Sequence, residues 1–485
     1  MSEFRFVDTT LRDGHLSLWA SGMTTGMMLP IAERMDRAGF EAIELVSGSN
    51  FKKCVRELKE DPWERIRQVA KRVTRTPLRL IAGRINTFGF DPRSMYRLFL
   101  ELATANGIRE ARISDPWNDF DGWERRVRLA REIGLAPVVN LIYSVSPRHT
   151  DEYYAARTRQ AVTLPVYRLC LKDPGGLLTP ERVRTLAPIV LANANGIHVE
   201  FHTHCTTGLG PLCCLEALKA GIKTINTAIP PLADGPSNPS LFNVAANARA
   251  MGFTPVVDEE VVRPVSAHFT TIAKREGLPI GAPVEYDYSQ YLHQVPGGMI
   301  SNLGHQLRLV GLEDRLDEAL EETARVRAEL AYPIMVTPLS QFVGSQAAIN
   351  IVVGERYREV TDQIIEYALG RYGREGADEM DADVKDRILS TPRARELAAS
   401  EPPEPSLQEM RRKYGGAGVS DEDLMLRWIV SKEDVDTMRA AGPQREYLTA
   451  SQPLVTLIRE LTRRTDVNRV RIRRPGFSVT LARRP

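Results

Sequence analysis

The sequence predicts an α/β fold: a (β/α)8 TIM barrel, followed by a mainly α-helical second domain and a small C-terminal helix–hairpin. The barrel is predicted by short apolar runs that alternate with amphipathic helical patterns through about residue 260. Eight alternations of roughly 25 to 35 residues each match a barrel of ~250 residues. Helical patterns also end in glycine before the next run, at Gly39, Gly107, Gly134 and Gly221.

The predicted strands are the short apolar runs Phe4–Val7, Ala42–Leu45, Leu78–Ala82, Glu110–Ile113, Pro137–Ile142, Val166–Leu171, Ile197–Phe201 and Thr224–Ala228. Helical patterns lie between them, for example at Met28–Ala38, Trp63–Arg72, Met95–Asn106 and Pro211–Ala220. Because active sites in this fold lie at the C-terminal ends of the strands, polar residues that follow the strands are the candidates for chemistry.

Four segments are expected along the chain. Residues 1–262 form the barrel, and 263–398 form a mainly helical domain with patterns such as Leu312–Tyr332 and Ser345–Tyr357. Residues 399–450 are expected to be a linker with irregular helices, since 399–420 is rich in Pro and Gly. Residues 451–485 are predicted to form a helix (Gln452–Arg464) and two strands (Val467–Arg473 and Phe477–Leu481), a candidate docking element for a partner.

Composition indicates a globular protein that acts in the cytoplasm. Of 485 residues, 43% are hydrophobic and 26% charged, and the net charge of +2 gives no argument for nucleic acid as a partner. No stretch approaches the ~20 apolar residues of a membrane span, and the start shows no signal-peptide pattern. The five cysteines show no CxxC spacing and are interpreted as reduced thiols.

A metal site is predicted from three residues. His202 and His204 lie two apart behind an alternating run, and a strand period of two would turn both rings to one side. An HxH pair by itself more often marks two polar residues at a strand end. Asp13, after the first predicted strand, adds a carboxylate at the same mouth of the barrel. Three such ligands with open positions are typical of a catalytic zinc, manganese or cobalt site.

Several motifs together resemble one family. The segments are Asp8–Asp13 (DTTLRD), Lys172–Asp173, His202-x-His204, Gln294–Leu307, Val336–Tyr357 and Gly370–Arg374. This set, in this order over about residues 4–375, resembles the carboxyltransferase subunits of biotin-dependent enzymes. These include the carboxyltransferase domain of pyruvate carboxylase, the α subunit of oxaloacetate decarboxylase and the 5S subunit of transcarboxylase. The resemblance also identifies the helical domain as a conserved carboxylase-type domain.

The resemblance implies roles for individual residues. Asp13, His202 and His204 would bind a divalent metal, zinc first, with manganese or cobalt as alternatives. Lys172 would be a fourth ligand as a carbamate formed with CO2, although a bare lysine there would more often be a solvated charge or pair with Asp173. Ser301 stands where the family often has threonine and would relay a proton between biotin and the acceptor carbon. Arg12 joins Lys172 and Ser301 as a predicted catalytic residue.

The biotin must come from a partner. No Met-Lys-Met biotinylation sequence occurs in the chain. The resemblance therefore implies that a biotin carboxyl carrier protein brings the biotin in trans and that a biotin carboxylase subunit charges it. It also implies a homo-oligomer inside a hetero-oligomeric complex.

Departures from the family concern the acceptor. Leu16 stands where pyruvate-handling members have glutamine, and Gly83 stands where they have the arginine that clamps the pyruvate carboxylate. Arg84 follows, but a one-residue step on a strand reverses the side chain, so we expect Arg84 to form a salt bridge outside the barrel. A third departure is Glu44–Phe51, where the family has an aromatic residue and two glycines. The predicted substrate contacts are His15, Leu16, Gly83, Arg84 and Asn86.

The sequence thus predicts a carboxyltransferase subunit that moves CO2 between carboxybiotin and a small acceptor other than pyruvate, one that need not carry a carboxylate. One alternative is the α subunit of an oxaloacetate or β-keto acid decarboxylase. Another is a metal-dependent lyase or Claisen-type synthase on the same barrel, which Lys172 and Ser301 disfavour. The last is a non-catalytic structural subunit, which Leu16 and Gly83 favour and the four metal positions oppose.

Overall fold

The structure is a computed structural model. It describes residues 2–86, 89–294, 307–308, 311–416, 418–442, 445, 447, 457–458, 461, 469–474 and 477–482.

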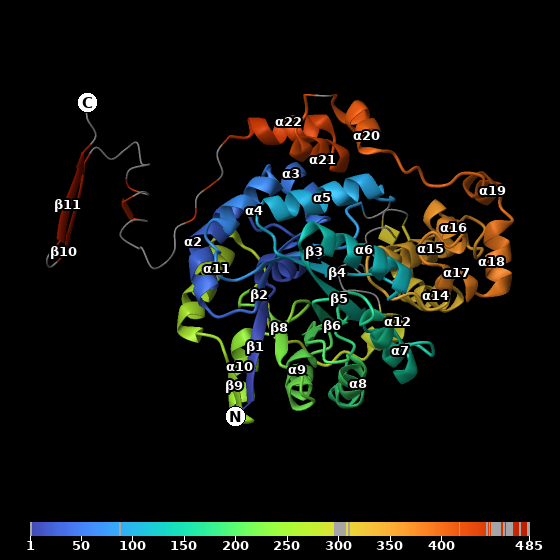
Figure 1. Cartoon of the computed structure of the whole chain (residues 1–485), viewed down its shortest axis with the longest axis horizontal. Helices are drawn as coiled ribbons and strands as arrows, with labels where there is room; N and C mark the ends of the chain where they lie inside the picture. The colour runs from blue at the N-terminus through green and yellow to red at the C-terminus, as the bar shows by residue number, and fades with distance from the viewer. Residues whose placement is uncertain are drawn as a thin grey trace.

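Eight parallel strands close into a barrel, as predicted (Figure 1). Strand β1 pairs with β8 on one side and with β2 on the other, which completes the ring. A short ninth strand, β9 (Phe253–Pro255), pairs with the start of β1. The barrel strands are β1 (Ser2–Asp8), β2 (Ala42–Ser47), β3 (Leu78–Ala82), β4 (Glu110–Ile113), β5 (Ala136–Ile142), β6 (Arg168–Asp173), β7 (Val199–Thr203) and β8 (Thr224–Thr227).

Two strands begin two residues later than predicted. Strand β6 begins at Arg168 rather than Val166, and β7 begins at Val199 rather than Ile197. Pairing between neighbouring strands fixes these ends, since the β6–β7 ladder runs to the pair Asp173 and Thr203. As a result, Lys172 and His202 lie inside the strands as direct partners, and not in the loops that follow them.

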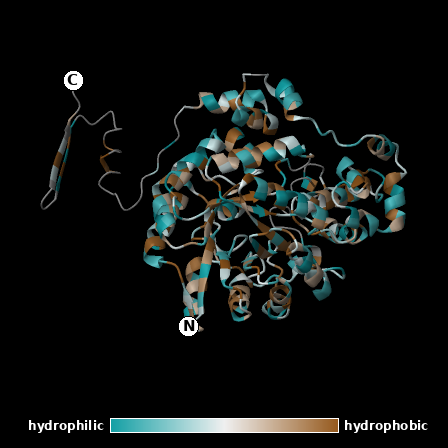
Figure 2. Cartoon of the chain, in the orientation of Figure 1, coloured by the Kyte–Doolittle hydropathy of each residue, from teal (hydrophilic) through white to brown (hydrophobic). Residues whose placement is uncertain are grey.

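Helices cover the outside of the barrel, and Figure 2 shows hydrophilic and hydrophobic residues alternating along them, as expected for amphipathic helices. Local caps set their ends. Asp119 accepts a hydrogen bond from the Gly122 amide (3.1 Å) where α6 begins. The helices are α1 (His15–Trp19), after the π-helical turn Thr10–Gly14, then α2 (Thr25–Arg37), α3 (Asn50–Arg56), α4 (Pro62–Ala70), α5 (Arg93–Ala105), α6 (Phe120–Ile133), α7 (Asp151–Ala161), α8 (Pro180–Asn193), α9 (Gly210–Lys219) and α10 (Leu241–Ala250).

The next helix, α11 (Glu259–Glu276), crosses the expected domain boundary at residue 262. It packs against α2, and Val265, Phe269 and Ile272 join the hydrophobic core of the barrel. The part of the chain that packs with the barrel therefore continues to residue 276.

A mainly helical region follows, in agreement with the prediction. Its core is formed by residues such as Phe342, Tyr367 and Ile388, and Trp117 of the barrel belongs to the same cluster. The region therefore packs directly on the barrel. Its elements are α12 (Ser289–His293), the 3-10 turn Glu313–Arg315, α14 (Leu316–Glu329), α15 (Leu339–Val353), α16 (Asp362–Ala368), α17 (Arg374–Asp378), α18 (Ala382–Leu389) and α19 (Pro392–Ala398).

The segment expected to be a linker with irregular helices contains α20 (Leu407–Tyr414), α21 (Asp421–Ile429) and α22 (Lys432–Ala440). Helix α21 packs on α5 and α22 packs on α3, and Figure 1 shows this group lying across the barrel's outer helices. Met410, Leu424 and Met425 are buried in the barrel core. The apolar faces of these helices are buried by packing against the barrel. The local Pro- and Gly-rich composition could not indicate this packing.

The predicted C-terminal hairpin is present: β10 (Arg469–Arg474) pairs antiparallel with β11 (Phe477–Ala482). It stands apart from the other elements in Figure 1. The predicted helix Gln452–Arg464 falls largely outside the described residues, of which 457–458 and 461 are helical. Across the described part of the chain, no helix combines the length and the apolar character that a bilayer crossing requires.

Candidate active site

Charged side chains fill the middle of the barrel. Arg79 donates two hydrogen bonds to Glu200 (2.8 and 2.7 Å) and also pairs with Glu110 (2.6 Å), while Arg112 pairs with Glu44. All five side chains are almost completely buried. Burial opposes ionisation of Glu200, but the Arg79 guanidinium outweighs it and lowers the pKa of Glu200 to about 2. We call these five residues the ionic layer.

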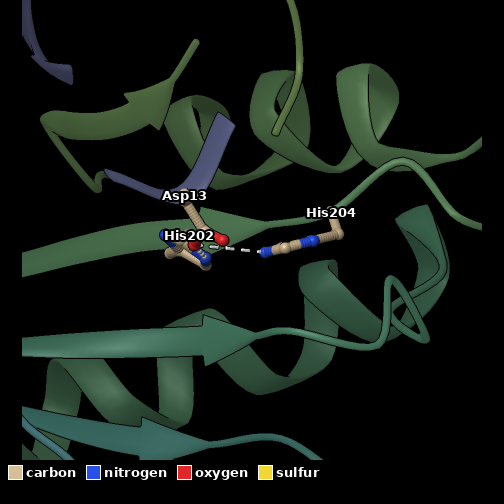
Figure 3. Close-up of side chains that lie close together, drawn as sticks. All are labelled: Asp13, His202 and His204. Carbon is tan, nitrogen blue, oxygen red and sulfur yellow. Dashed lines mark ion pairs between the residues drawn. The ribbon is translucent and has the colours of Figure 1, made fainter. Parts of the chain in front are cut away.

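The three predicted metal ligands converge at the C-terminal end of the barrel (Figure 3). The Nε2 atoms of His202 and His204 each lie 3.4 Å from the Oδ2 atom of Asp13. A metal ion needs at least three such donor atoms close together. Among the described residues, Asp13, His202 and His204 form the one group of histidine, cysteine and carboxylate donors that meets this condition. An ion with bonds of about 2.1 Å to tetrahedral or octahedral ligands places those ligands roughly 3.0–3.5 Å apart. The observed spacing therefore fits a divalent metal.

Hydrogen bonds orient both imidazoles for this task. The Nδ1 atom of His204 lies 2.7 Å from the Pro236 carbonyl oxygen, which can only accept, so Nδ1 carries the proton and Nε2 keeps its lone pair. The Nδ1 atom of His202 lies 3.1 Å from the Asn226 Oδ1 atom. Arg112 donates to that same oxygen (2.8 Å), and its Nη1 atom also lies 3.3 Å from His202 Nδ1. The Nε2 atoms of both rings face the Asp13 carboxylate, where an ion would lie.

The electrostatic environment keeps the donors in the protonation states that a cation needs. Burial, followed by the Arg112 guanidinium, lowers the pKa of His202 to about 3, so the ring is neutral. Burial opposes the charge of Asp13, but Arg12 and His204 outweigh it and hold the pKa of Asp13 well below its usual value. One polar contact would have to yield to an ion: the Asn238 amide nitrogen lies 3.2 Å from His202 Nε2.

Arg12 positions the carboxylates around it. Its Nη2 atom lies 2.9 Å from Asp13 Oδ2 and 2.6 Å from Glu44 Oε2. Arg12 therefore links the ionic layer to the metal-ligand group.

Lys172 lies on β6 directly opposite His202 in the strand register and is half-buried. Burial, followed by the nearby charges of Arg112 and Arg12, lowers the pKa of Lys172 to about 8. The lower pKa increases the fraction of neutral amine, which is the form that reacts with CO2. The alternative pairing with Asp173 is absent from the described structure, where Asp173 accepts hydrogen bonds from the Leu177 amide (2.8 Å) and the Thr203 hydroxyl (2.9 Å).

A cavity of about 790 Å³ opens above these residues, and we call it the catalytic cavity. Its walls come from the barrel and from the helical region, which contributes Met335–Pro338, Ser340 and Gln341. Seven of the predicted site residues line it: Arg12, Asp13, Leu16, Gly83, Arg84, Lys172 and His204.

Three predicted residues are not in the described lining, and a fourth cannot be placed. His202 is fully buried beneath the cavity. His15 is buried, and Asn86 uses its backbone amide to bind Asp91 (3.0 Å). Ser301 lies outside the described residues.

Arg84 corrects one expectation. Its guanidinium does not form a salt bridge outside the barrel within the described structure. It lies 4.5 Å from the ring centre of Tyr372, donates to the Gly89 carbonyl (3.0 Å) and lines the catalytic cavity. The physical reason is that β3 ends at Ala82, so the alternation of strand side chains no longer applies at residue 84.

Two of the departures from the family, Leu16 and Gly83, line the catalytic cavity. Leu16 is 41% exposed on the cavity wall. A Cβ atom built at Gly83 would meet no atom within 4 Å, so the position leaves open space in the cavity.

Sequence reasoning missed several lining residues. Arg126 of α6 lines the cavity, with its Nη1 atom donating to the Ser114 carbonyl (2.8 Å). Nothing in the sequence distinguishes it from other charged residues of an amphipathic helix. Ser47, Asn50 and Lys53 also line the cavity. The departure noted at Glu44–Phe51 was the signal that could have identified the first two.

Fold and site together define a class: a (β/α)8-barrel enzyme with its active site at the C-terminal ends of the strands and a donor set suited to a divalent metal. Two family models match the chain, "HMGL-like" over residues 3–268 and "Conserved carboxylase domain" over residues 291–453. The chain therefore belongs to the biotin-dependent carboxyltransferase family. Membership of this family implies that the biotin is carried by a partner and that the site uses a divalent metal.

Individual relatives agree with this assignment. A pyruvate carboxylase subunit of Methanothermobacter thermautotrophicus is 35% identical over 88% of this chain and 75% of its own length. The 2-oxoglutarate carboxylase large subunit of Hydrogenobacter thermophilus is 32% identical over 76% of this chain, which spans 57% of that relative. The fold matches the carboxyl transferase domain of Rhizobium etli pyruvate carboxylase with a TM-score of 0.81 at 22% identity, covering 91% of this chain and 78% of that one.

Proposed function

We propose that this chain is the carboxyltransferase subunit of a multi-subunit biotin-dependent carboxylase. It would move CO2 from carboxybiotin to a small acceptor in the catalytic cavity. The observation that carries the proposal is the convergence of Asp13, His202 and His204 below a cavity that Lys172 also lines. A divalent ion held there would supply Lewis-acid polarisation of the acceptor oxygen.

The chain's own residues would divide the remaining work. Lys172 would add a fourth anionic ligand as a carbamate, and Arg12 would hold the Asp13 carboxylate in place. Ser301 would carry the acceptor's proton to the ureido nitrogen that carboxybiotin frees on losing CO2, and the resulting carbanion would attack that CO2. The role of Ser301 rests on the family motif.

We propose that the acceptor is a carbon acid that carries a carboxylate and is larger than pyruvate. Arg84 and Arg126 line the catalytic cavity and can bind a carboxylate, so an acceptor without one is no longer favoured. Leu16 offers no hydrogen bond, and Gly83 leaves open space. Both features suit a larger acceptor better than pyruvate. The related subunits are named for pyruvate and for 2-oxoglutarate.

The partners would be a biotin carboxyl carrier protein and a biotin carboxylase subunit. Within such a complex we also propose that the chain forms a homo-oligomer. Operation in the opposite direction, as the α subunit of a β-keto acid decarboxylase, uses the same residues. A purely structural role is less consistent with an open cavity beside an intact donor set.

The test is a carboxylation assay with purified carrier and carboxylase subunits, ATP and labelled bicarbonate. Pyruvate, 2-oxoglutarate, longer keto acids, simple ketones, amides and ureas would be compared. We expect a keto acid larger than pyruvate to give the highest kcat/KM, and Arg84→Gln to raise its KM. If pyruvate is best by a wide margin, or if a neutral ketone or urea is best, the proposed acceptor class is wrong.

Ser301→Ala provides a separate test of the proton relay. We expect the fold and metal content to remain while exchange between carboxybiotin and acceptor is lost. Transfer at a near wild-type rate would show that another group moves the proton.

A further inference from the structure

A second cavity of about 530 Å³ lies on the flank of the barrel, between α5, α6 and residues 401–404. We call it the outer cavity. Its lining is dominated by positive charge: three carboxylates, Asp91, Glu401 and Glu404, face six arginines, namely Arg84, Arg93, Arg97, Arg125, Arg126 and Arg371.

Four of these arginines pair with carboxylates: Arg93 with Glu404 (3.5 Å), Arg97 with Glu101 and Glu132 (2.8 and 2.7 Å), Arg126 with Asp115 (3.7 Å) and Arg371 with Glu366 (3.5 Å). Both oxygens of Asp91 accept backbone hydrogen bonds, from Ile85 (2.8 Å) and Asn86 (3.0 Å). Within the described part of the chain, neither Arg84 nor Arg125 forms an ion pair with a carboxylate. Partial removal from water, followed by the neighbouring guanidinium groups of Arg126 and Arg93, lowers the pKa of Arg125. The guanidinium groups of Arg84 and Arg125 are therefore suited to an added anion.

At the rim of the outer cavity, a carboxylate side chain of the protein itself already occupies an anion position. The Glu404 carboxylate accepts a hydrogen bond from the Arg93 amide at the start of α5 (2.9 Å) and lies 3.5 Å from the Arg93 Nε atom. An external anion would meet the same guanidinium group there. Glu404 is thus a built-in competitor that a ligand would have to displace.

The outer cavity also shares a wall with the catalytic cavity. Arg84 and Arg126 line both. Arg371 adds a link to the helical region, since it contacts the Leu397 carbonyl (2.6 Å) in front of residues 401–404. A ligand in the outer cavity would therefore touch the barrel, the helical region and two residues of the catalytic wall.

We propose that the outer cavity binds a small polyanion bearing phosphate or carboxylate groups, and that this anion acts as an effector of carboxyl transfer through Arg84 and Arg126. The binding step is independent of the proposed function, whereas the effector step rests on it. Coupling between two sites is reciprocal, so the acceptor must change the anion's affinity by the same factor by which the anion changes the acceptor's.

Binding is tested on the full chain by thermal shift and calorimetry with ADP, inorganic pyrophosphate and tricarballylate. We expect saturable stabilisation, and the comparison of the three probes distinguishes phosphate from carboxylate ligands. Arg125→Gln should weaken binding by about tenfold, the effect of losing one charge-assisted hydrogen bond. Glu404→Gln should strengthen it. Arg128→Gln, on the same helix but outside the cavity, is the matched control and should bind like the wild type.

If no probe binds, or if Arg125→Gln binds as tightly as Arg128→Gln, the assignment of the outer cavity is wrong. The effector step is tested by measuring the anion Kd with and without the best acceptor. A change of several-fold in the wild type, absent in Arg125→Gln, supports it. An unchanged Kd would overturn the effector step. A chain that binds the anion but transfers no carboxylate would contradict the proposed function alone.

Discussion

The barrel contains two groups of buried polar side chains, the ionic layer and the group of Asp13, His202 and His204. They differ in how their hydrogen-bonding atoms are paired. In the ionic layer, every carboxylate faces a guanidinium, as in the two hydrogen bonds between Arg79 and Glu200. At the mouth, Asp13, His202 and His204 turn their lone pairs toward one point. Glu200 and His202 are only two residues apart on β7. Glu200 is held by guanidinium groups, whereas the Nε2 atom of His202 faces the Asp13 carboxylate and the Asn238 amide.

The comparison teaches that burial of charge does not by itself mark a functional site. Both groups are buried, and both shift pKa values strongly. The ionic layer closes its own hydrogen bonds, whereas the mouth group gathers one carboxylate and two imidazoles in the arrangement that we propose holds a cation. Four predictions separate these roles, from the largest expected effect to the smallest.

The double variant His202→Ala and His204→Ala should lose nearly all bound metal and all carboxyl transfer, because two of the proposed ligands are gone. Metal content of the purified protein measures this, with about one ion per chain expected in the wild type. His198→Ala is the control: its ring lies near the start of the same strand, 2.7 Å from Thr224, and should leave the metal in place. Stoichiometric metal in the double variant would refute the site.

Lys172→Arg should lower activity by a hundredfold or more, on the order of the largest losses seen when groups supporting a metal site are removed. Arginine keeps the positive charge but cannot form a carbamate. Labelled CO2 should give a carbamate NMR signal in the wild type that the variant lacks. Lys219→Arg, on α9, is the matched control. An active Lys172→Arg enzyme would show that no carbamate is needed.

Arg79→Met should destabilise the fold by about 3–5 kcal/mol, since it leaves Glu200 and Glu110 buried without their shared cation. Denaturant unfolding measures this. Arg128→Gln breaks an exposed pair with Glu124 and should cost less than about 0.5 kcal/mol. Equal effects of the two variants would mean that the ionic layer is not what holds the strands together.

The ionic layer should also make the free energy of unfolding depend on pH in the acidic range. Glu200 has a folded pKa of about 2, below its unfolded value of about 4.3, so its contribution is complete above pH 4.3 and is lost as the pH falls toward 2. This group alone adds a slope of up to about 1.4 kcal/mol per pH unit in that window. In Glu200→Gln the slope of unfolding free energy against pH should be flatter there. An identical slope would assign the acid sensitivity to other carboxylates.

The sequence by itself determined the barrel and its strand order, and it predicted that Asp13, His202 and His204 lie at one mouth of the barrel. Apolar periodicity and the HxH spacing are local properties, and a strand period of two predicts that His202 and His204 share a side whatever surrounds them. The charges of the ionic layer were visible as single residues in apolar strands, such as Glu44 and Arg79. Their pairing was not, because it depends on strands far apart in the sequence.

Tertiary structure alone decided the rest of the cavity. Arg84 faces the catalytic cavity because β3 ends two residues earlier, and Arg126 enters it from a helix that looks ordinary in sequence. Residues 335–338, 340 and 341 form part of the cavity wall, and α20–α22 pack on the barrel. These contacts join segments far apart in the chain, so they depend on where each element stops and on which neighbour covers it, which no local pattern records.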